Sequence, residues 1–322
     1  MILQGKGVHC HYEIRGGLFG RIKGAVHAVN GVDLHLRDGE ALGIVCESGF
    51  LKSTLRRALV VLEPLQKREV LLKGKALNAK QTHQEEMEAR RSLQMIFQDP
   101  VTSLNPRLTI FETLSEPMLV HGLCSKENAR ERVTKLLQKV ELSSDAMDRY
   151  PHAFSGGQRQ RISIARALGL EPKVLICDEV VSALDVSVQA QILQLLQKLK
   201  KEEGMAMIFI SHDLAVVRQL CDRLMVLYLG GVVEQGPCQD IFNQPRHPYT
   251  RALLDAIPSL DPERPPKLLK GERPSAQNLP SGCSFQSRCE HSTDACKLPP
   301  KLDSSEYGWA CHHPLAPNSQ KT

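Results

Sequence analysis

Short apolar runs alternate with amphipathic stretches over about the first 255 residues of the chain. The runs at 41–45, 174–177 and 205–210 are apolar, and polar residues follow each of them, which predicts three buried strands. Between the last two runs, the segment Ser187 to Lys201 carries apolar residues at helical spacing: Val188, Ile192, Leu195, Leu196 and Leu199. This segment is predicted to be a helix packed on a sheet, and the alternation as a whole predicts an α/β domain.

The proline content of the chain rises sharply after Asp255, because ten of the nineteen prolines lie beyond that residue. We therefore predict a large α/β domain over residues 1–254 and a loop-rich extension over residues 255–322. A hydrophobic share of 42% and a charged share of 24% exclude wholesale disorder. The net charge of +5 is too small to indicate nucleic acid as a partner.

Hydropathy predicts a cytosolic chain without a membrane span. The longest apolar candidate, Leu224 to Val233, has ten residues and includes two glycines, and the N-terminus lacks the apolar core of a signal peptide. Stable disulfides are rare in the cytosol, so the ten cysteines need another explanation.

The first predicted strand feeds a candidate phosphate-binding loop: Cys46, Glu47, Ser48, Gly49, Phe50, Leu51, Lys52, Ser53 and Thr54. A phosphate loop has the pattern G-x-x-x-x-G-K-[ST], in which glycines let backbone N–H groups surround phosphates. Here Lys52, Ser53 and Thr54 follow the pattern, but Cys46 and Leu51 replace both defining glycines. On its own, this loop is a weak signal.

Two further segments carry candidate chemistry. Ser155, Gly156, Gly157 and Gln158 open a predicted helix, where backbone N–H groups and the helix dipole favour a phosphate, although the same residues would suit an ordinary helix cap. Asp178 and Glu179 end a predicted strand and supply one carboxylate for Mg²⁺ and one to polarise water. Since strand ends in open parallel sheets bind ligands, we expect these segments to share one site.

The order of these motifs resembles that of an ATP-binding cassette (ABC) ATPase: Lys52 to Thr54, Gln98, Ser155 to Gln158, Asp178 and Glu179, Ser182 to Asp185, and His212. The resemblance is closer to the ATPase subunits of dipeptide and oligopeptide importers, through the segments 97–100, 103–107, 150–152, 181–188 and 246–250. It covers nearly the whole chain. It implies an α/β fold with an ABC-type P-loop ATPase domain, a helical subdomain at about residues 98–168, and a small cysteine-containing C-terminal extension.

The resemblance also implies roles for individual residues. Tyr12 would stack on adenine, Lys52 would contact the β- and γ-phosphates of ATP, and Ser53, Gln98 and Asp178 would act at Mg²⁺. Glu179 would be the general base, and His212 would contact the γ-phosphate. Ser155, Gly156, Gly157 and Gln158 would reach the ATP held by a partner subunit in a head-to-tail dimer, where catalysis is mainly positioning and charge neutralisation.

The departures from the family pattern lead to a hypothesis about nucleotide binding. A glycine beside the lysine permits positive φ and close approach of a phosphate. Arg56 and Val61 also stand at positions where relatives often have glycine. Val180 follows the glutamate, at a position where relatives usually have proline or alanine. Such grouped changes suggest relaxed constraint, so we predict weakened or lost ATP binding at this loop.

Four cysteines, Cys283, Cys289, Cys296 and Cys311, lie in the proline-rich extension. Their spacing matches neither a zinc ribbon nor a ferredoxin, and leaves a metal site and unpaired thiols as equal alternatives. The family resemblance places a [4Fe–4S] cluster first and zinc second.

The resulting functional expectation is an ATPase subunit of a peptide importer, peripheral on the cytoplasmic face of the inner membrane. Its expected partners are a second ABC ATPase, two membrane permeases and an extracytoplasmic peptide-binding protein, with a permease helix docking near Gln98 to Arg107. The alternatives are a non-hydrolytic subunit that completes the partner's site and a soluble, non-transport ABC ATPase. Dipeptide, oligopeptide, glutathione and nickel cargo are all compatible with the sequence.

Overall fold

The computed structural model describes residues 1–16, 21–46, 54, 67–77, 81–257, 269, 271–272, 274–303 and 306–317. The chain divides into two compact units that interleave along the sequence. The first unit holds Met1–Leu3, Leu36–Ala41 and Leu71–Ile210, and the second holds Gln4–His35, Leu42–Val70 and Ser211–Thr322. Among the described residues, no helix is long and apolar enough to cross a membrane.

Three parallel strands form the sheet of the first unit: β6 (Leu93–Ile96), β7 (Val174–Asp178) and β8 (Ala206–Ser211). Every residue of β7 and β8 is buried, as expected for a parallel sheet that is covered on both faces. The predicted strands at 174–177 and 205–210 are therefore confirmed, each displaced by one residue at most. A hairpin also belongs here, since β5 (Lys75–Ala76) pairs with the end of β4 (Lys67–Leu72).

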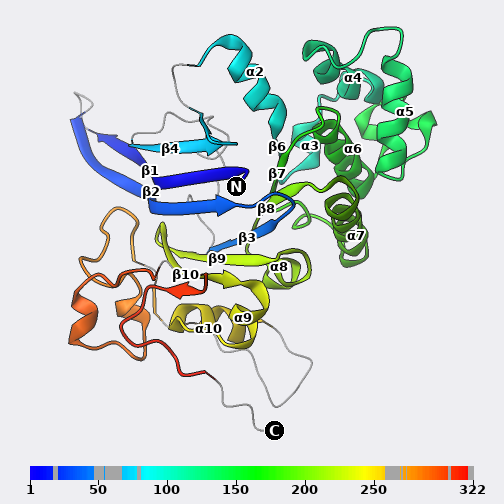
Figure 1. Ribbon diagram of the computed structural model, residues 1–322. Coiled ribbons are helices and arrows are strands. Elements are labelled where there is room, and N and C mark those ends of the chain that lie inside the picture. Colours follow the sequence, from blue (N-terminus) through cyan, green and yellow to red (C-terminus); the bar gives the residue numbers. More distant parts are fainter. Residues whose placement is uncertain are drawn as a thin grey trace. The chain divides into compact units, whose positions relative to one another are not determined.

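Helices make up most of the remaining first unit, and Figure 1 shows α4, α5 and α6 packed together. The helices are α2 (His83–Ser92), α3 (Pro100–Ser103), α4 (Ile110–Val120), α5 (Ala129–Lys139), α6 (Gly156–Leu168) and α7 (Val186–Glu203), with short 3₁₀ turns η1 (Ser144–Ala146) and η2 (Pro151–Ala153). Helix α7 contains the predicted segment Ser187 to Lys201. It buries Ile192, Leu195, Leu196 and Leu199, and it ends at Gly204, whose φ of 59° suits glycine.

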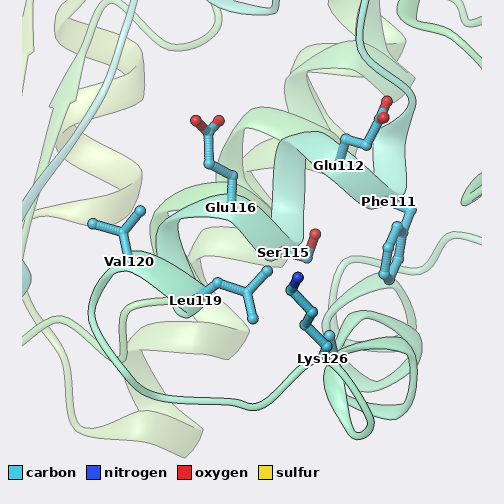
Figure 2. Close-up of a pocket in the computed structure, with 8 residues that line it drawn as sticks. Phe111, Glu112, Ser115, Glu116, Leu119, Val120 and Lys126 are labelled. Atoms are coloured by element: carbon cyan, nitrogen blue, oxygen red, sulfur yellow. The ribbon is translucent and has the colours of Figure 1, made fainter.

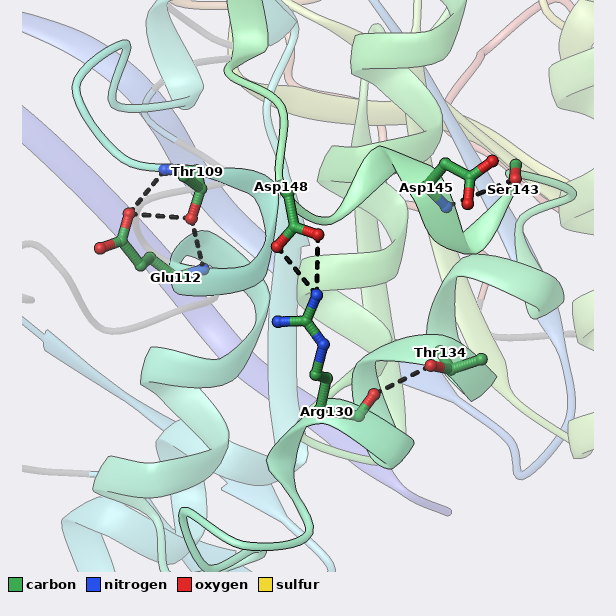
Figure 3. A network of polar contacts seen from close by, with 7 residues as sticks. All are labelled: Thr109, Glu112, Arg130, Thr134, Ser143, Asp145 and Asp148. Carbon is green, nitrogen blue, oxygen red and sulfur yellow. Dashed lines mark hydrogen bonds and ion pairs between the residues drawn. The ribbon is translucent and has the colours of Figure 1, made fainter.

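Figure 3 shows the polar contacts at the first turns of α4 and α5. Thr109 and Glu112 form a capping box at the start of α4, and the N–H of Thr109 lowers the pKa of the Glu112 carboxyl. Arg130 pairs with Asp148 at 2.7 Å, but both side chains are exposed, so this pair contributes little stability. The capping box therefore marks the start of α4, whereas the N-cap residue of α5, Asn128, makes no side-chain cap bond.

Within the part of the chain that the structure describes, the second unit contains its own strands and three helices. Strands β1 (Leu3–Gly16) and β2 (Arg21–Leu36) are hydrogen-bonded neighbours. Strand β3 (Ala41–Cys46) runs parallel to β9 (Arg223–Tyr228), and β9 pairs antiparallel with β10 (Gly231–Pro237), which pairs with β11 (Gly308–Trp309). The helices are α8 (Leu214–Leu220), α9 (Cys238–Asn243) and α10 (Pro248–Asp255), followed by the 3₁₀ turns η3 (Gln286–Arg288) and η4 (Asp294–Lys297).

A buried cluster of polar groups around Glu234, here called the Glu234 hub, joins the C-terminal residues to β10. The Glu234 carboxylate is fully buried and accepts bonds from the N–H of Arg246 at 2.7 Å, the N–H of His247 at 3.0 Å and the Tyr307 hydroxyl at 3.1 Å. Burial nevertheless raises the pKa of Glu234 above its usual range. Beside the hub, the Arg246 guanidinium lies 4.7 Å from the centre of the Trp309 ring in β11. The segment 246–250, singled out in the sequence, is thus an anchor for the extension.

Candidate functional site

The carboxyl ends of β6 and β7 carry the central pair of the candidate site. These strands are parallel neighbours in the first unit, so their ends meet at one edge of the sheet. Gln98 follows β6 and Glu179 follows β7, and the Gln98 Nε2 donates a hydrogen bond of 2.7 Å to the Glu179 Oε2. The structure therefore brings together two predicted site residues that are 81 positions apart.

Asp178 and Glu179 differ in their surroundings. Asp178 is the last residue of β7 and only 2% exposed, whereas Glu179 is half-buried. Glu179 has a φ of 45°, in the left-handed region that non-glycine residues rarely adopt. Its N–H donates to the carbonyl of Ile210 in β8 at 2.9 Å, so its backbone is tied to the neighbouring strand. Such strained residues cluster at functional sites.

Helix α6 begins at the predicted Ser155–Gln158 segment. Ser155 is the N-cap, and its hydroxyl accepts from the N–H of Gln158 while the Gln158 side chain accepts from the N–H of Ser155. Gly156 and Gly157 occupy the first two helical positions, where N–H groups have no acceptor within the helix. A Cβ on Gly157 would overlap Val188 of α7, so the close packing of these helices requires a glycine there. The segment is therefore a capped helix start whose free N–H groups suit an anion, and its predicted contact with a partner's ATP stays a prediction.

The phosphate-loop residues are described only at the two ends of the loop. Cys46 ends β3 and is buried, and Thr54 is buried with its hydroxyl donating to the Tyr12 Oη at 3.1 Å. The predicted binding residues Glu47, Ser48, Gly49, Phe50, Leu51, Lys52 and Ser53 lie outside the described residues. The predicted strand at 41–45 is confirmed. The adenine role of Tyr12 stays a prediction, and Tyr12 is linked to the far end of the loop.

His212 follows the last residue of β8, and its side chain is exposed. It belongs to the second unit, as do Tyr12 and Thr54, whereas Gln98, Asp178, Glu179 and Ser155 belong to the first. The role predicted for His212 at a γ-phosphate stays a prediction.

The four cysteines of the extension lie in the second unit. Cys283 and Cys296 are buried, and the N–H of Cys283 donates to the carbonyl of Cys296 at 2.8 Å. Burial, with smaller contributions from the three other thiols, raises the pKa of Cys311 to about 11. Phe285 anchors this segment, because its ring lies 5.3 Å from those of Tyr228 and Tyr249.

The four cysteine thiolates are a ligand type that zinc and iron–sulfur clusters accept. Backbone N–H groups donate to these sulfurs, among them that of His313 to Cys311 at 3.4 Å, and such bonds tune thiolate ligands. Among the described residues, however, no group of three or more His, Cys, Asp and Glu side chains is placed to hold a metal ion. Neither the predicted cluster nor zinc gains support from the arrangement of the side chains.

A groove on the helical part of the first unit was not located from the sequence. It has a volume of about 440 Å³ and is lined by Phe111, Glu112, Ser115, Glu116, Leu119, Val120, Lys126 and Ala129. Figure 2 shows Leu119 and Val120 near the end of α4, with Lys126 reaching toward Ser115. The predicted docking segment lies just before α4, and it exposes Val101, which is 57% accessible, beside the exposed Phe97. The exposed apolar side chains of Leu119 and Val120 are the signal that points to this surface.

Comparison with known proteins identifies both parts of the chain. The family model described as "ABC transporter" matches residues 29–182, and the model described as "Oligopeptide/dipeptide transporter, C-terminal region" matches residues 233–296. The oligopeptide transport ATP-binding protein OppF of Escherichia coli (strain K12) is 49% identical over 92% of this chain and 90% of that protein. The di/tripeptide transport ATP-binding protein DppF of Pseudomonas aeruginosa is 43% identical over 97% of each chain.

A solved structure supports the fold assignment. The ATP-binding cassette MJ0796, in a post-hydrolysis state bound to ADP and Pi, matches with a TM-score of 0.64 and 30% identity. The match covers 74% of this chain and 99% of that one. The predicted ABC-type P-loop ATPase fold is thereby confirmed. The chain belongs to the ABC transporter ATPase family, within the branch of oligopeptide and dipeptide transporter ATP-binding proteins.

Proposed function

We propose that this chain is an ATPase subunit that powers the import of peptides across the inner membrane. One observation carries the proposal: a single chain matches both the ABC transporter family and the C-terminal region of oligopeptide and dipeptide transporters. The subunit works on the cytoplasmic face of the membrane with a second ATPase, two permeases and an extracytoplasmic peptide-binding protein.

Co-expression with candidate permeases tests this assignment. The tagged chain should co-purify with the permeases from detergent-solubilised membranes. Vesicles that contain the complex should accumulate labelled peptide only when ATP and the binding protein are present. Recovery of the chain with ribosomes or nucleic acid instead, without permeases, would favour the soluble ABC ATPase and overturn the proposal.

The described geometry supports a division of labour among the polar residues of the first unit. Asp178 would be a ligand of Mg²⁺, as would Ser53, which lies outside the described residues, and Glu179 would accept a proton from the attacking water. Gln98 orients the Glu179 carboxylate, to which it donates a hydrogen bond of 2.7 Å. Gly156 and Gly157 present N–H groups and the positive end of the α6 dipole to the γ-phosphate of ATP on the partner subunit.

The remaining residues act on this chain's own nucleotide. Lys52 binds the β- and γ-phosphates, His212 contacts the γ-phosphate and Tyr12 packs against adenine. Lys52 and His212 would neutralise charge on the phosphates and Tyr12 would position the nucleotide, and none of the three forms a covalent bond to it.

The phosphate loop of this chain binds ATP weakly. If Leu51 takes the backbone conformation of the missing glycine, the cost is roughly 1–3 kcal/mol, which is a loss of about one to two orders of magnitude in affinity. A matched set of chains measures this: the native chain, the Cys46→Gly/Leu51→Gly chain, and the same double variant with Lys52→Ala. The double variant should bind ATP tighter than the native chain, and Lys52→Ala should remove the gain. Equal affinity of the native chain and the double variant would refute the impairment.

The missing glycines favour one alternative function, in which the chain is a non-hydrolytic subunit that completes the partner's site through Ser155 to Gln158. The Glu179→Gln change in the assembled transporter separates the two. It lowers ATP turnover if this chain hydrolyses its own ATP and leaves turnover unchanged if only the partner's site works. Ser155→Ala should lower turnover in both cases.

The groove on α4 is the proposed seat of a permease helix. Its lining combines the apolar Leu119 and Val120 with the charged residues Glu112, Glu116 and Lys126, and this mixture suits an amphipathic helix with charged flanks. Val120 is 65% exposed, although it is apolar. Crosslinking from a cysteine at position 120 to the cytoplasmic loops of the permeases should succeed in the complex, whereas a cysteine at position 134 should not crosslink.

Cys283, Cys289, Cys296 and Cys311 are proposed to bind a [4Fe–4S] cluster, or else zinc, which would anchor the loop-rich extension. Metal analysis and visible absorption of anaerobically purified protein distinguish these ligands. A brown sample with about four irons per chain supports the cluster, a colourless zinc-loaded sample supports zinc, and a metal-free folded sample refutes both.

A further inference from the structure

Glu179 interrupts the regular course of strand β7. Side chains alternate between the two faces of an extended strand, so a residue after the buried Asp178 would normally point to the opposite face of the sheet. The left-handed conformation of Glu179, at a φ of 45°, breaks this alternation. The Glu179 carboxylate is therefore aimed at the edge where Gln98 bonds to it. The orientation of the Glu179 side chain thus depends on a left-handed backbone conformation, which glutamate rarely adopts.

Ser182 bonds to the backbone of Glu179 twice. Its N–H donates to the Glu179 carbonyl at 3.0 Å, and its hydroxyl donates to the same oxygen at 2.9 Å. The N–H bond alone is what an ordinary four-residue turn makes, so the hydroxyl is an addition. Because both carbonyl lone pairs are engaged, the peptide plane after Glu179 is fixed in orientation.

The surrounding residues hold the turn from outside. Val180 and Val181 are each 6% exposed, so their side chains are packed in the core. The side-chain amide of Gln189, one turn into α7, donates to the Val181 carbonyl at 2.8 Å. The turn is therefore anchored to α7 on one side and, through the Glu179 N–H, to β8 on the other.

We propose that Ser182 is a positioning residue, whose hydroxyl holds the left-handed backbone of Glu179 and thereby sets where the Glu179 carboxylate lies. The inference rests on the proposed role of Glu179 as general base. Ser182 does not contact nucleotide in this role; it acts through Glu179, while Gln98 fixes the far end of the same side chain.

The first test is a double-mutant cycle on unfolding of the full chain, and it does not depend on ATPase activity. Glycine adopts the left-handed region freely, so in a Glu179→Gly chain the turn no longer needs to be held. Ser182→Ala should lower the midpoint of thermal unfolding by about 1–3 °C in the native background and by less than half of that in the Glu179→Gly background.

Thr134→Ala is the matched control for this cycle. Thr134 also donates a 2.9 Å hydrogen bond to a backbone carbonyl, that of Arg130 in α5 (Figure 3). Its removal should shift the midpoint equally in both backgrounds. An equal shift for Ser182→Ala in both backgrounds would make the hydroxyl a plain loop contact and overturn the inference.

The second test measures ATP turnover in the assembled transporter, with the Cys46→Gly/Leu51→Gly chain so that its own site is filled. Ser182→Ala should lower kcat by roughly 10- to 100-fold with KM for ATP unchanged, and Ser182→Thr, which keeps the hydroxyl, should restore it. In a Glu179→Gln background Ser182→Ala should have no further effect. Unchanged kcat in Ser182→Ala, alongside a large loss in Glu179→Gln, would refute the positioning role. If Glu179→Gln itself changes nothing, the proposed general base fails, and the unfolding cycle decides the role of Ser182 by itself.

Discussion

Removing the Tyr307 hydroxyl should destabilise the protein, because the hydroxyl serves the buried Glu234 carboxylate. In Tyr307→Phe, Glu234 keeps its two backbone donors at Arg246 and His247 but loses the bond of 3.1 Å from Tyr307. The single hydroxyl proton of Tyr307 is shared between Glu234 and the carbonyl of Gln244, which lies 2.5 Å from the hydroxyl oxygen, so the variant removes this donor from both acceptors. A hydrogen bond to a buried charged group contributes about 1.5–3 kcal/mol, so we expect a loss of about 2 kcal/mol in the free energy of unfolding at neutral pH.

The pH dependence of this loss follows from the pKa of Glu234. Burial raises the pKa of Glu234 in the folded state above its value in the unfolded chain, and Tyr307 opposes that rise. Between the two pKa values the folded state binds more protons, so the contribution of Glu234 to stability falls as pH increases through this window. Without the hydroxyl, the folded pKa rises further. The cost of Tyr307→Phe should therefore be larger at pH 8 than at pH 5.

Urea unfolding at both pH values, followed by fluorescence, measures this cost. Tyr150→Phe is the matched control, since Tyr150 is 43% exposed and stacks on His152. It should change the free energy of unfolding by less than about 0.5 kcal/mol at either pH. If Tyr307→Phe costs no more than the control, or the same at both pH values, the assigned role of the hub is wrong.

Three further predictions use other contacts. Gly157→Ala should lower the unfolding midpoint by several degrees because its Cβ meets Val188, and Val188→Ala in the same chain should recover most of the loss, as thermal denaturation will record. Phe285→Ala, at a side chain that is 3% exposed, should cost about 3 kcal/mol and speed the reaction of the extension's thiols with Ellman's reagent; Leu298→Ala, at an exposed site, should do neither. Val120→Glu should reduce co-purification of the permeases without changing the unfolding midpoint, and unchanged recovery would remove the α4 groove as their binding surface.

Sequence patterns located the regular elements because burial follows periodicity. Four of the five predicted apolar positions of α7, at Ile192, Leu195, Leu196 and Leu199, lie in the core, as do the apolar strands β7 and β8, whereas Val188 is only half-buried. The family pattern identified Gln98 and Glu179 separately. Their hydrogen bond needs β6 and β7 to be adjacent and parallel, and strand order is not written in the local sequence.

Other features had no local signal at all. Glu234 looks like a solvent-facing residue in a strand, and its hydroxyl partner Tyr307 is 73 positions away. The left-handed φ of Glu179 was equally hidden, because left-handed turns are usually marked by Gly or Asn. The division into domains at residue 254, the roles of the site residues and the metal of the cysteines stay predictions.

The pairing of β11 with β10 has a consequence for the newly made chain. Trp309 lies opposite Glu234, and the N–H of Ala310 donates to the carbonyl of Val233 at 2.8 Å, so this short strand covers part of a sheet edge. An uncovered edge presents unpaired N–H and C=O groups to any other strand. During translation β10 is complete long before β11 leaves the ribosome, and in that interval its edge is open to mispairing with neighbouring nascent chains. Ribosomes that stall or terminate early within the extension would therefore release proteins prone to aggregate, even though every residue of the nucleotide site had already been made.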